Sequence, residues 1–326
     1  MLFIILTASL VSLADGTPPQ TLGTWIPTYG DSETNPLYNE TVAAAALARL
    51  AAAGANTIYI DAWHAGLTTF PSSTWSVAAG NVSFTGVDYL SFPVTIAKSL
   101  GLRVIAWFEY GLMYDGILQA AQPSWYLGES SGFSFMNASN PNVADFLVGI
   151  TIDALNHQPL LDGVQFDDHF AWPSTLSSGI SPEVKQNTLT QLISRIRSSV
   201  QKSFPLSFFS IAPNPADSAL ADQNVDWPLW LKLNLCDDVI VQLYCYDADY
   251  FKFRMEQQFD ALPDPTFADR LKMGILLNNG NVSNVNATAM MRAELEAAKY
   301  GGQVLWYSRG ILLYSYEAVK EIWSQV

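Results

Sequence analysis

Two adjacent aspartates and a histidine, Asp167, Asp168 and His169, directly follow a short apolar segment at residues 163–166. Two carboxyl groups this close push their pKa values apart, so one can stay protonated at a pH at which the other is ionised. Such a pair suits the cleavage of a glycosidic bond, in which one carboxyl group protonates the leaving oxygen. The second carboxylate attacks the anomeric carbon or activates a water molecule.

Polar and aromatic residues follow the other apolar segments in the same manner. The further candidate site residues are Trp25, Asp61, His64, Glu109, Tyr110, Asn214, Gln242, Tyr244, Tyr246, Asp247, Trp306 and Arg309. We expect Asp168 to be the proton donor and Asp167 to be its electrostatic partner or the nucleophile. Because adjacent residues rarely form a complete acid and nucleophile pair, we expect Glu109 to be the opposing carboxylate, with Asp247 as the alternative.

The remaining candidates, Asp61 and Arg309 among them, are expected to bind the substrate. Hydrogen bonds to sugar hydroxyls are predicted for His64, His169, Asn214, Gln242 and Tyr244. Aromatic faces can stack on sugar rings, which predicts that role for Trp25, Trp63, Tyr110, Tyr246 and Trp306. Simpler interpretations stay open, namely rings buried in the core, a loop-capping Asp168, an ion pair between Glu109 and Arg309, and a turn residue at Asp162.

Several other chemistries lack their residues in this sequence. The three histidines form no HExxH or His-x-His arrangement, so they do not supply a histidine-rich zinc site, although carboxylates could hold calcium. A G-x-S-x-G match at residues 128–132 has no apolar strand before it, and we interpret it as chance. Glycine-rich phosphate motifs are absent as well. We therefore expect neither a metal nor a cofactor.

Eight apolar segments of strand length alternate with helix-like amphipathic segments. Strands are predicted at residues 22–26, 57–61, 103–108, 163–166, 206–211, 238–244, 272–277 and 303–307. Helices are predicted at residues 41–53, 89–100, 141–156, 182–204, 227–233, 250–261, 287–300 and 315–324. This alternation predicts a (β/α)8 TIM barrel, whose active site lies at the C-terminal ends of the strands. A doubly wound sheet is the alternative, but residues 27–31 lack its glycine-rich fingerprint.

The composition limits the possible partners and location. The 326 residues carry a net charge of −14, and so acidic a chain repels a phosphate backbone, which argues against a nucleic-acid partner. Residues 1–16 predict a signal peptide cleaved near Ala14, followed by one catalytic domain at residues 17–326. No other segment is apolar enough to cross a membrane. We expect a secreted monomer that binds a polysaccharide or oligosaccharide.

Two further patterns bear on secretion. Sequons for N-glycosylation occur at Asn39, Asn81, Asn137, Asn281 and Asn286. Cys236 and Cys245 stand nine positions apart across a predicted strand, a span of roughly 30 Å that no disulfide bridges. We expect both cysteines to be free buried thiols.

Residues 162–170, Asp-Gly-Val-Gln-Phe-Asp-Asp-His-Phe, resemble the strand-four signature of the family-10-like glycosyl hydrolases. Ala106-Trp107-Phe108-Glu109, Ile211-Ala212-Pro213-Asn214 and Gln242-Leu243-Tyr244 are similar to other strands of that family, within a resemblance that covers residues 21–310. The resemblance implies a TIM-barrel glycoside hydrolase acting on an extracellular or cell-wall polysaccharide. Bacterial members include secreted or lipoprotein enzymes that act on peptidoglycan glycan strands.

Three alternatives accompany this expectation. True xylanase-type barrels carry a carboxylate after strand seven, where this chain has Leu277-Asn278-Asn279-Gly280, so the resemblance is not to them. A non-catalytic carbohydrate-binding barrel would keep the fold without the activity. A carbohydrate esterase or deacetylase would usually need a metal, for which histidines are scarce.

Overall fold

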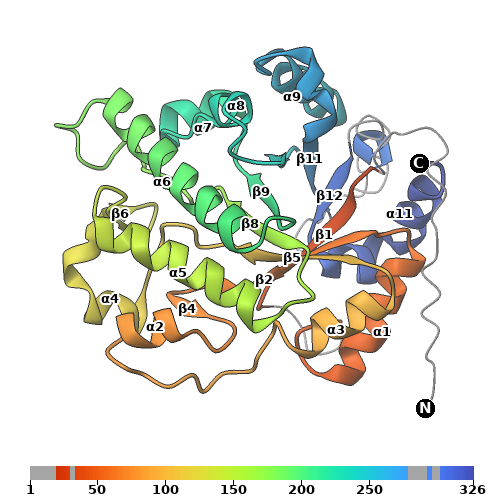
Figure 1. The fold of residues 1–326 in the computed structure, drawn as a ribbon. Coiled ribbons are helices and arrows are strands. Elements are labelled where there is room, and N and C mark those ends of the chain that lie inside the picture. The colour runs from red at the N-terminus through yellow and green to blue at the C-terminus, as the bar shows by residue number, and fades with distance from the viewer. Residues whose placement is uncertain (1–19, 30–33, 278–291, 296–301) are drawn as a thin grey trace.

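The protein is described from a computed structural model, which covers residues 20–29, 34–277, 292–295 and 302–326. Eight parallel strands form a closed barrel at the centre of the molecule (Figure 1), which confirms the predicted (β/α)8 TIM barrel. Around the barrel the strands are β1 (Leu22–Ile26), β2 (Thr57–Asp61), β5 (Arg103–Phe108), β8 (Gly163–Asp167), β9 (Phe208–Ala212), β10 (Asp238–Leu243), β11 (Leu271–Leu276) and β12 (Gln303–Trp306), which pairs with β1.

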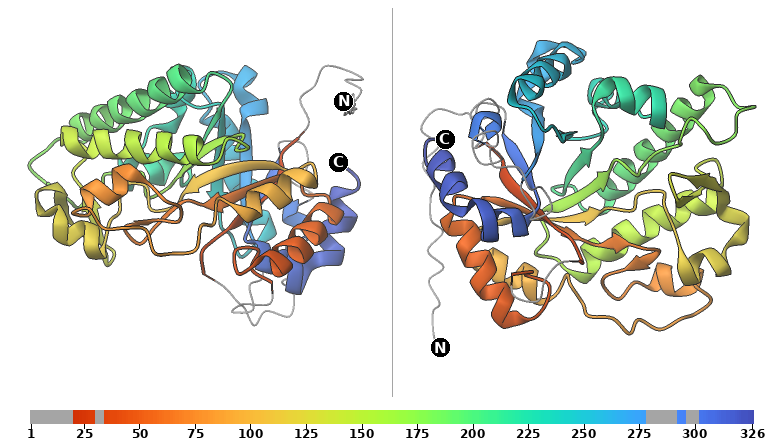
Figure 2. Two further views of the ribbon diagram at one scale, coloured as in Figure 1. Left: turned by 60° about the horizontal axis from the view of Figure 1, so that its bottom comes forward. Right: turned by 180° about the vertical axis from the view of Figure 1, so that it is seen from behind.

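Helices cover the outside of this barrel in Figures 1 and 2. They are α1 (Glu40–Ala52), α3 (Phe92–Ser99), α5 (Pro141–His157), α6 (Pro182–Ser203), α7 (Ala216–Gln223), α8 (Trp227–Lys232), α9 (Ala248–Asp260) and α11 (Tyr316–Trp323). At the start of α1, the Asn39 side chain caps the helix by accepting a hydrogen bond from the Val42 amide at 3.0 Å. Most of the helix predicted at residues 287–300 lies outside the described residues, as does the predicted signal peptide.

The loops after β2 and β5 contain short elements that the sequence analysis did not predict. The loop after β2 holds β3 (Trp63–His64), β4 (Leu67–Thr68) and α2 (Ser73–Ala78). The loop after β5 holds α4 (Gly116–Ala121), η1 (Pro123–Trp125) and an antiparallel hairpin of β6 (Tyr126–Ser130) and β7 (Phe133–Met136). The G-x-S-x-G match falls in this hairpin rather than at a strand-to-helix elbow. Two single turns, η2 (Pro265–Arg270) and η3 (Gly310–Ser315), precede β11 and α11.

The inside of the barrel is a separate aromatic layer. Trp25, Tyr59 and Trp107 are at most 1% exposed and pack with other inward residues of the strands. Burial of a ring of this size stabilises the fold by about 2–3 kcal/mol. One amide connects this layer: the Gln165 side chain accepts a hydrogen bond from the Trp25 indole at 2.7 Å and donates one to Ser210 at 2.9 Å. These three polar groups are therefore paired, whereas the buried Tyr59 hydroxyl has no hydrogen-bond partner among the described residues.

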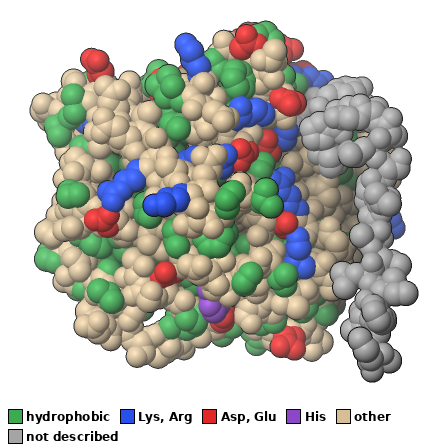
Figure 3. All heavy atoms as spheres, in the orientation of Figure 1, with side chains coloured by type: hydrophobic (Ala, Val, Ile, Leu, Met, Phe, Trp, Pro, Cys, Tyr) green, Lys and Arg blue, Asp and Glu red, His purple; other side chains and the backbone are tan. Residues whose placement is uncertain are grey.

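The surface of the molecule carries charged side chains of both signs. On the face shown in Figure 3, basic side chains are interspersed with acidic ones. Among the described helices, none combines the length and the apolar character needed to cross a bilayer. Cys236 and Cys245 are both free and buried, which confirms the prediction.

Candidate active site

Asp167 is the last residue of β8 and lies at the C-terminal end of the barrel, beside Glu109. The register pairs Phe108 with Phe166, so Glu109 and Asp167 occupy the next positions on neighbouring strands. Strand alternation places Asp167 on the same face as Gln165, toward the inside, as predicted. The Asp167 carboxyl group accepts hydrogen bonds from the Trp107 indole at 3.0 Å, the Asp168 amide at 2.8 Å and the Gln242 side chain.

The environment of Asp167 favours its protonated form. The residue is 8% exposed, and burial raises the pKa of its carboxyl group well above the usual range. The negative charge of Asp168 raises this pKa further, and that of Glu109 adds to the effect. The hydrogen bonds from the Asp168 amide and the Trp107 indole oppose this rise, because they stabilise the ionised form. Burial outweighs them, so Asp167 can carry a proton at a pH at which an exposed aspartate has lost it.

Asp168 begins the loop after β8 and is more accessible, with 18% of its side chain exposed. It accepts a hydrogen bond from the Asn214 side chain at 3.0 Å. The Nδ1 atom of His169 lies 3.3 Å from the Asp168 carboxylate and 3.1 Å from the Glu109 carbonyl oxygen. Because both of these oxygens accept, Nδ1 of His169 carries the hydrogen.

Glu109 is nearly buried and is the centre of a second group. Its Oε2 atom lies 2.5 Å from Nδ1 of His64, and its Oε1 atom accepts a 3.4 Å hydrogen bond from the Tyr29 hydroxyl. Burial and the charges of Glu109 and Asp61 raise the pKa of Tyr29, so its hydroxyl keeps its hydrogen. Glu109 thus contacts His64, and not Arg309 as in the ion pair that the sequence left open. The Arg309 guanidinium lies 5.9 Å from the centre of the Tyr314 ring.

Asp61 does not fit the substrate-binding role expected from the sequence, because it is 0% exposed. Its Oδ2 atom accepts hydrogen bonds from the Thr28 amide at 3.4 Å and hydroxyl at 3.2 Å, and lies 3.4 Å from Nδ1 of His64. Burial, and then the charge of Glu109, raise the pKa of Asp61. Asp61 therefore lies on the buried side of His64 and Glu109 and helps to position them. Its own side chain is not accessible to a ligand.

Two loops that carry carboxylates are fixed to each other by backbone contacts. The Leu112 amide donates to the His169 carbonyl oxygen at 3.0 Å. At Gly111, φ is +48°, and a Cβ atom there would lie 2.3 Å from the Phe170 nitrogen. Only glycine allows this approach in this backbone conformation. These two backbone contacts fix the distance between Glu109 and the Asp167–Asp168 pair.

The predicted stacking residues divide into buried and accessible rings. Trp25 and Trp63 are 1% and 0% exposed, so neither offers a face to a sugar, in contrast to the prediction. Both rings are held in the core, where the Trp63 indole donates to the Gly111 carbonyl oxygen at 3.2 Å. Trp306 is half-buried and packs 6.1 Å from Tyr244, whereas Tyr246 is 66% exposed at the rim.

Three residues to which the sequence assigned no role at the site are brought to it by the structure. Trp107 and Tyr29 bind the carboxylates directly, and Phe133 lies over Tyr110 and His169 from the β6–β7 hairpin. Trp107 and Tyr29 stand at strand ends, which could have revealed them. Phe133 had no such signal, since its place depends on how the hairpin folds.

Two other carboxylates have structural roles. Asp247, the alternative opposing carboxylate, is exposed and accepts a 2.7 Å hydrogen bond from the Tyr250 amide, which caps α9. It is therefore a helix cap, and Glu109 is the carboxylate whose charge acts on Asp167. Asp162 lies at the opposite end of β8, where it pairs with Lys98 at 2.8 Å and accepts from the Val104 amide at 2.7 Å.

Two sets of residues have the donor atoms that a divalent cation binds, namely Asp61, His64 and Glu109, and Asp167, Asp168 and His169. Within each set the donor atoms lie within 4.8 Å of one another. In both sets the same atoms already hydrogen-bond within the site.

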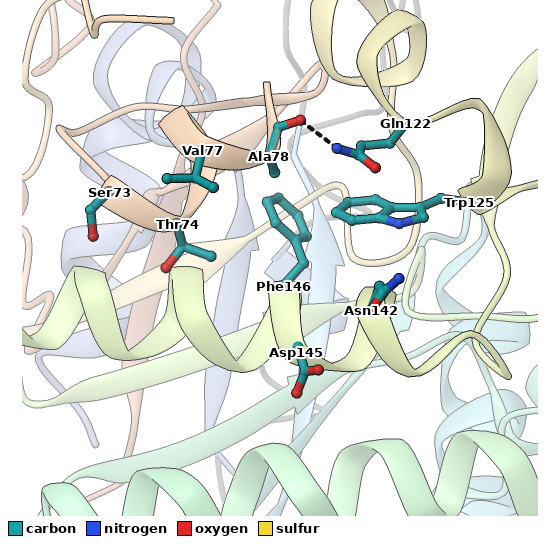
Figure 4. Close-up of a pocket in the computed structure, with 9 residues that line it drawn as sticks. All are labelled: Ser73, Thr74, Val77, Ala78, Gln122, Trp125, Asn142, Asp145 and Phe146. Atoms are coloured by element: carbon teal, nitrogen blue, oxygen red, sulfur yellow. Dashed lines mark hydrogen bonds between the residues drawn. The ribbon is translucent and has the colours of Figure 1, made fainter. Parts of the chain in front are cut away.

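A separate groove of about 540 Å³ lies between α2, η1 and α5, where Trp125 and Phe146 form its apolar floor (Figure 4). Its ionisable group is Asp145, which forms an ion pair with Arg195. One carboxylate without a second cannot supply the acid and the base of a glycosidic cleavage. This groove therefore lacks the second carboxyl group that the C-terminal end of the barrel supplies.

Comparisons with known proteins agree with the fold. A search of solved structures finds the glycoside hydrolase domain of PgaB (BpsB) from Bordetella bronchiseptica at a TM-score of 0.70 and 14% identity, covering 93% of this chain and 99% of that one. The C-terminal domain of a putative chitinase from Desulfitobacterium hafniense DCB-2 matches at 0.61 and 12% identity, covering 94% and 99%. A putative alpha-L-fucosidase from Bacteroides thetaiotaomicron matches at 0.60 and 10%, covering 99% of both chains.

At these identities the solved structures show the shared fold alone. A search of curated proteins finds no match. The Glycosyl hydrolase-like 10 family matches residues 22–183, a segment that contains β1, β2, β5 and β8 with Glu109, Asp167 and Asp168. Through this segment, the chain matches the Glycosyl hydrolase-like 10 family, which confirms the resemblance seen in the sequence.

Proposed function

We propose that this protein is a glycosidase that hydrolyses O-glycosidic bonds of an extracellular or cell-wall polysaccharide. One observation carries the proposal: a buried Asp167, whose pKa is raised, lies beside Asp168 and Glu109 at the C-terminal end of the barrel. Glycosidic cleavage needs a carboxyl group that still holds its proton next to one that has lost it.

In this proposal Asp167 is the proton donor, which reverses the roles that we expected for the two aspartates. Asp167 is the more buried of the two, and the charge of Asp168 helps to keep it protonated. Its proton passes to the glycosidic oxygen as the bond from that oxygen to the anomeric carbon breaks. Asp168, fixed by Asn214, is the electrostatic partner.

Glu109 is the second carboxylate of the proposed mechanism. It either forms a bond to the anomeric carbon or removes a proton from the water that does so. His64 and Tyr29 donate hydrogen bonds to its two oxygens, which fixes the orientation of the carboxylate. Gln242 and Asn214 hold Asp167 and Asp168 in the same way, so these polar residues orient the carboxyl groups in addition to any contact with sugar.

The substrate class and location are part of the same proposal. A polysaccharide is supported by the family and by the glycoside hydrolase and putative chitinase among the similar structures. Residues 1–16 have the composition of a signal peptide, which supports export of a single catalytic domain at residues 17–326. Tyr244, Tyr246, Trp306 and Tyr110 are the rings that we propose to meet the sugar chain.

Release of reducing ends from a panel of polysaccharides, peptidoglycan included, tests the proposal. We expect activity in the native protein and a fall in kcat of about 10²–10⁴-fold in Asp167→Asn, because the amide cannot protonate the leaving oxygen. Glu109→Gln should lose activity to a similar degree. Asp162→Asn changes a carboxylate of the same strand at its other end and should keep its kcat. Equal activity in Asp167→Asn and the native protein would show that the proposal is wrong.

A further inference from the structure

Phe133 is an exposed aromatic residue that packs against Tyr110 and His169, which are neighbours of the proposed catalytic groups. It stands at the start of β7 and is 41% exposed. Its ring centre lies 6.4 Å from that of Tyr110, nearly perpendicular to it, and 5.9 Å from that of His169. Tyr110 in turn packs 4.7 Å from His64, the partner of Glu109. Through these ring contacts, Phe133 is connected to the loops after β5 and β8, the two strands whose ends carry the carboxyl groups.

The hairpin that carries Phe133 is firmly attached to the barrel. The Tyr114 amide donates to the Ser134 carbonyl oxygen at 3.1 Å, and the Met136 amide donates to the Leu112 carbonyl oxygen at 2.8 Å. Met113 also forms a bridge with Phe135. An aromatic side chain held in this way loses little conformational entropy when a ligand covers it.

A small polar cavity lies directly beside Phe133. It has a volume of about 150 Å³, and its lining includes Tyr110, Asp115, Glu129, Phe133 and Ser134. This volume equals roughly five water molecules, enough for the substituents of one sugar ring but not for the whole ring. Its ionisable groups besides the tyrosines are carboxylates, which accept hydrogen bonds from hydroxyls and repel an anionic ligand.

We propose that Phe133 and this cavity form a sugar-binding subsite for an uncharged pyranose unit next to the bond that is cleaved. The apolar face of the ring stacks on Phe133, and its hydroxyls donate to the cavity. A purely apolar ligand would offer these carboxylates no hydrogen bond, whereas a pyranose ring has both an apolar face and hydroxyl donors. This subsite deepens the proposed function and depends on it.

Three substitutions on the same hairpin test the subsite. Phe133→Ala should weaken binding of a hexasaccharide by about fivefold to tenfold, because it removes the stacking face. Phe133→Trp restores a ring and should bind within about twofold of the native protein. Tyr126→Ala removes an equally exposed ring, 46% exposed at the far end of β6, and should bind like the native protein.

Binding is measured by titration calorimetry with cellohexaose, chitohexaose, maltohexaose and hexagalacturonate, and KM and kcat are measured for any hexasaccharide that is cleaved. We expect at least one uncharged hexasaccharide to bind more tightly than hexagalacturonate, and the rise in KM of Phe133→Ala to exceed its fall in kcat. Equal affinity of Phe133→Ala and native protein, tighter binding of hexagalacturonate, or no binding at all would overturn the subsite. Absence of cleavage despite Phe133-dependent binding would instead overturn the proposed function alone.

Discussion

Trp107 lowers the pKa of Asp167 through an indole hydrogen bond, although burial has the larger, opposite effect. That bond stabilises the ionised carboxylate, so its loss in Trp107→Phe should raise the pKa of Asp167 further. If Asp167 must be protonated to act, the alkaline limb of the kcat–pH profile moves to higher pH in this variant. The profile of kcat from about pH 4 to pH 9 measures the shift.

Trp75→Phe is the matched control for this change. It also loses a buried ring volume and an indole hydrogen bond, donated to the Gly66 carbonyl oxygen at 2.8 Å, but has no contact with Asp167. Its alkaline limb should coincide with that of the native protein. A shift of the same size in both variants would mean that packing, rather than the hydrogen bond, sets the pKa of Asp167.

Asp167 and Asp61 show how far the sequence could predict the site. Alternation along an apolar strand correctly placed Asp167 inside, because the period of two is a property of every strand. The burial of Asp61 was missed, because it depends on Thr28, His64 and Glu109 covering the strand end from three other segments. Such covering is a tertiary property that no local pattern records.

At the scale of elements, the close approach of the loops after β5 and β8 makes Gly111 a sensitive position. Gly111→Ala places a Cβ atom against the Phe170 nitrogen in a left-handed conformation. We expect the free energy of unfolding to fall by about 2–4 kcal/mol, through backbone strain and overpacking. Activity should fall as well, since the same contact positions Glu109 relative to Asp167. Chemical denaturation and kcat are the measurements.

Gly101→Ala separates the backbone strain from the contact. Gly101 also has a positive φ, +77°, but a Cβ atom there meets nothing within 4 Å. It should lose about 1 kcal/mol and keep its activity. If Gly111→Ala were no more harmful than Gly101→Ala, the two loops would not be held by this contact.

The eight strands of the barrel could be predicted because buried parallel strands are apolar throughout. The predicted ends of all eight strands lie within two residues of the observed ends. The β6–β7 hairpin could not be predicted from the sequence. Its strands are half-exposed, and its pairing is stabilised by the backbone of residues 112–114 of the β5 loop. Phe133, and with it the proposed subsite, therefore became visible only in three dimensions.

The whole molecule carries a net charge of −14, and one of its acidic groups is buried with no hydrogen-bond partner among the described residues. Burial, and then the charge of Asp247, raise the pKa of Glu294 from 4.5 to about 8. A group whose pKa is higher in the folded than in the unfolded state binds its proton more tightly when folded. Its contribution to stability is therefore complete below about pH 4.5 and is lost as the pH rises to about 8.

Glu294→Gln removes this dependence, because the amide has no charge to bury. We expect the variant to be more stable than the native protein at pH 9, on the order of 3 kcal/mol, and no more stable at pH 4. Thermal unfolding at a series of pH values measures the difference. Glu256→Gln, which changes an exposed glutamate of α9, should unfold in parallel with the native protein throughout. A stabilisation of Glu294→Gln that is the same at pH 4 and pH 9 would show that packing, and not the buried charge, distinguishes the two proteins.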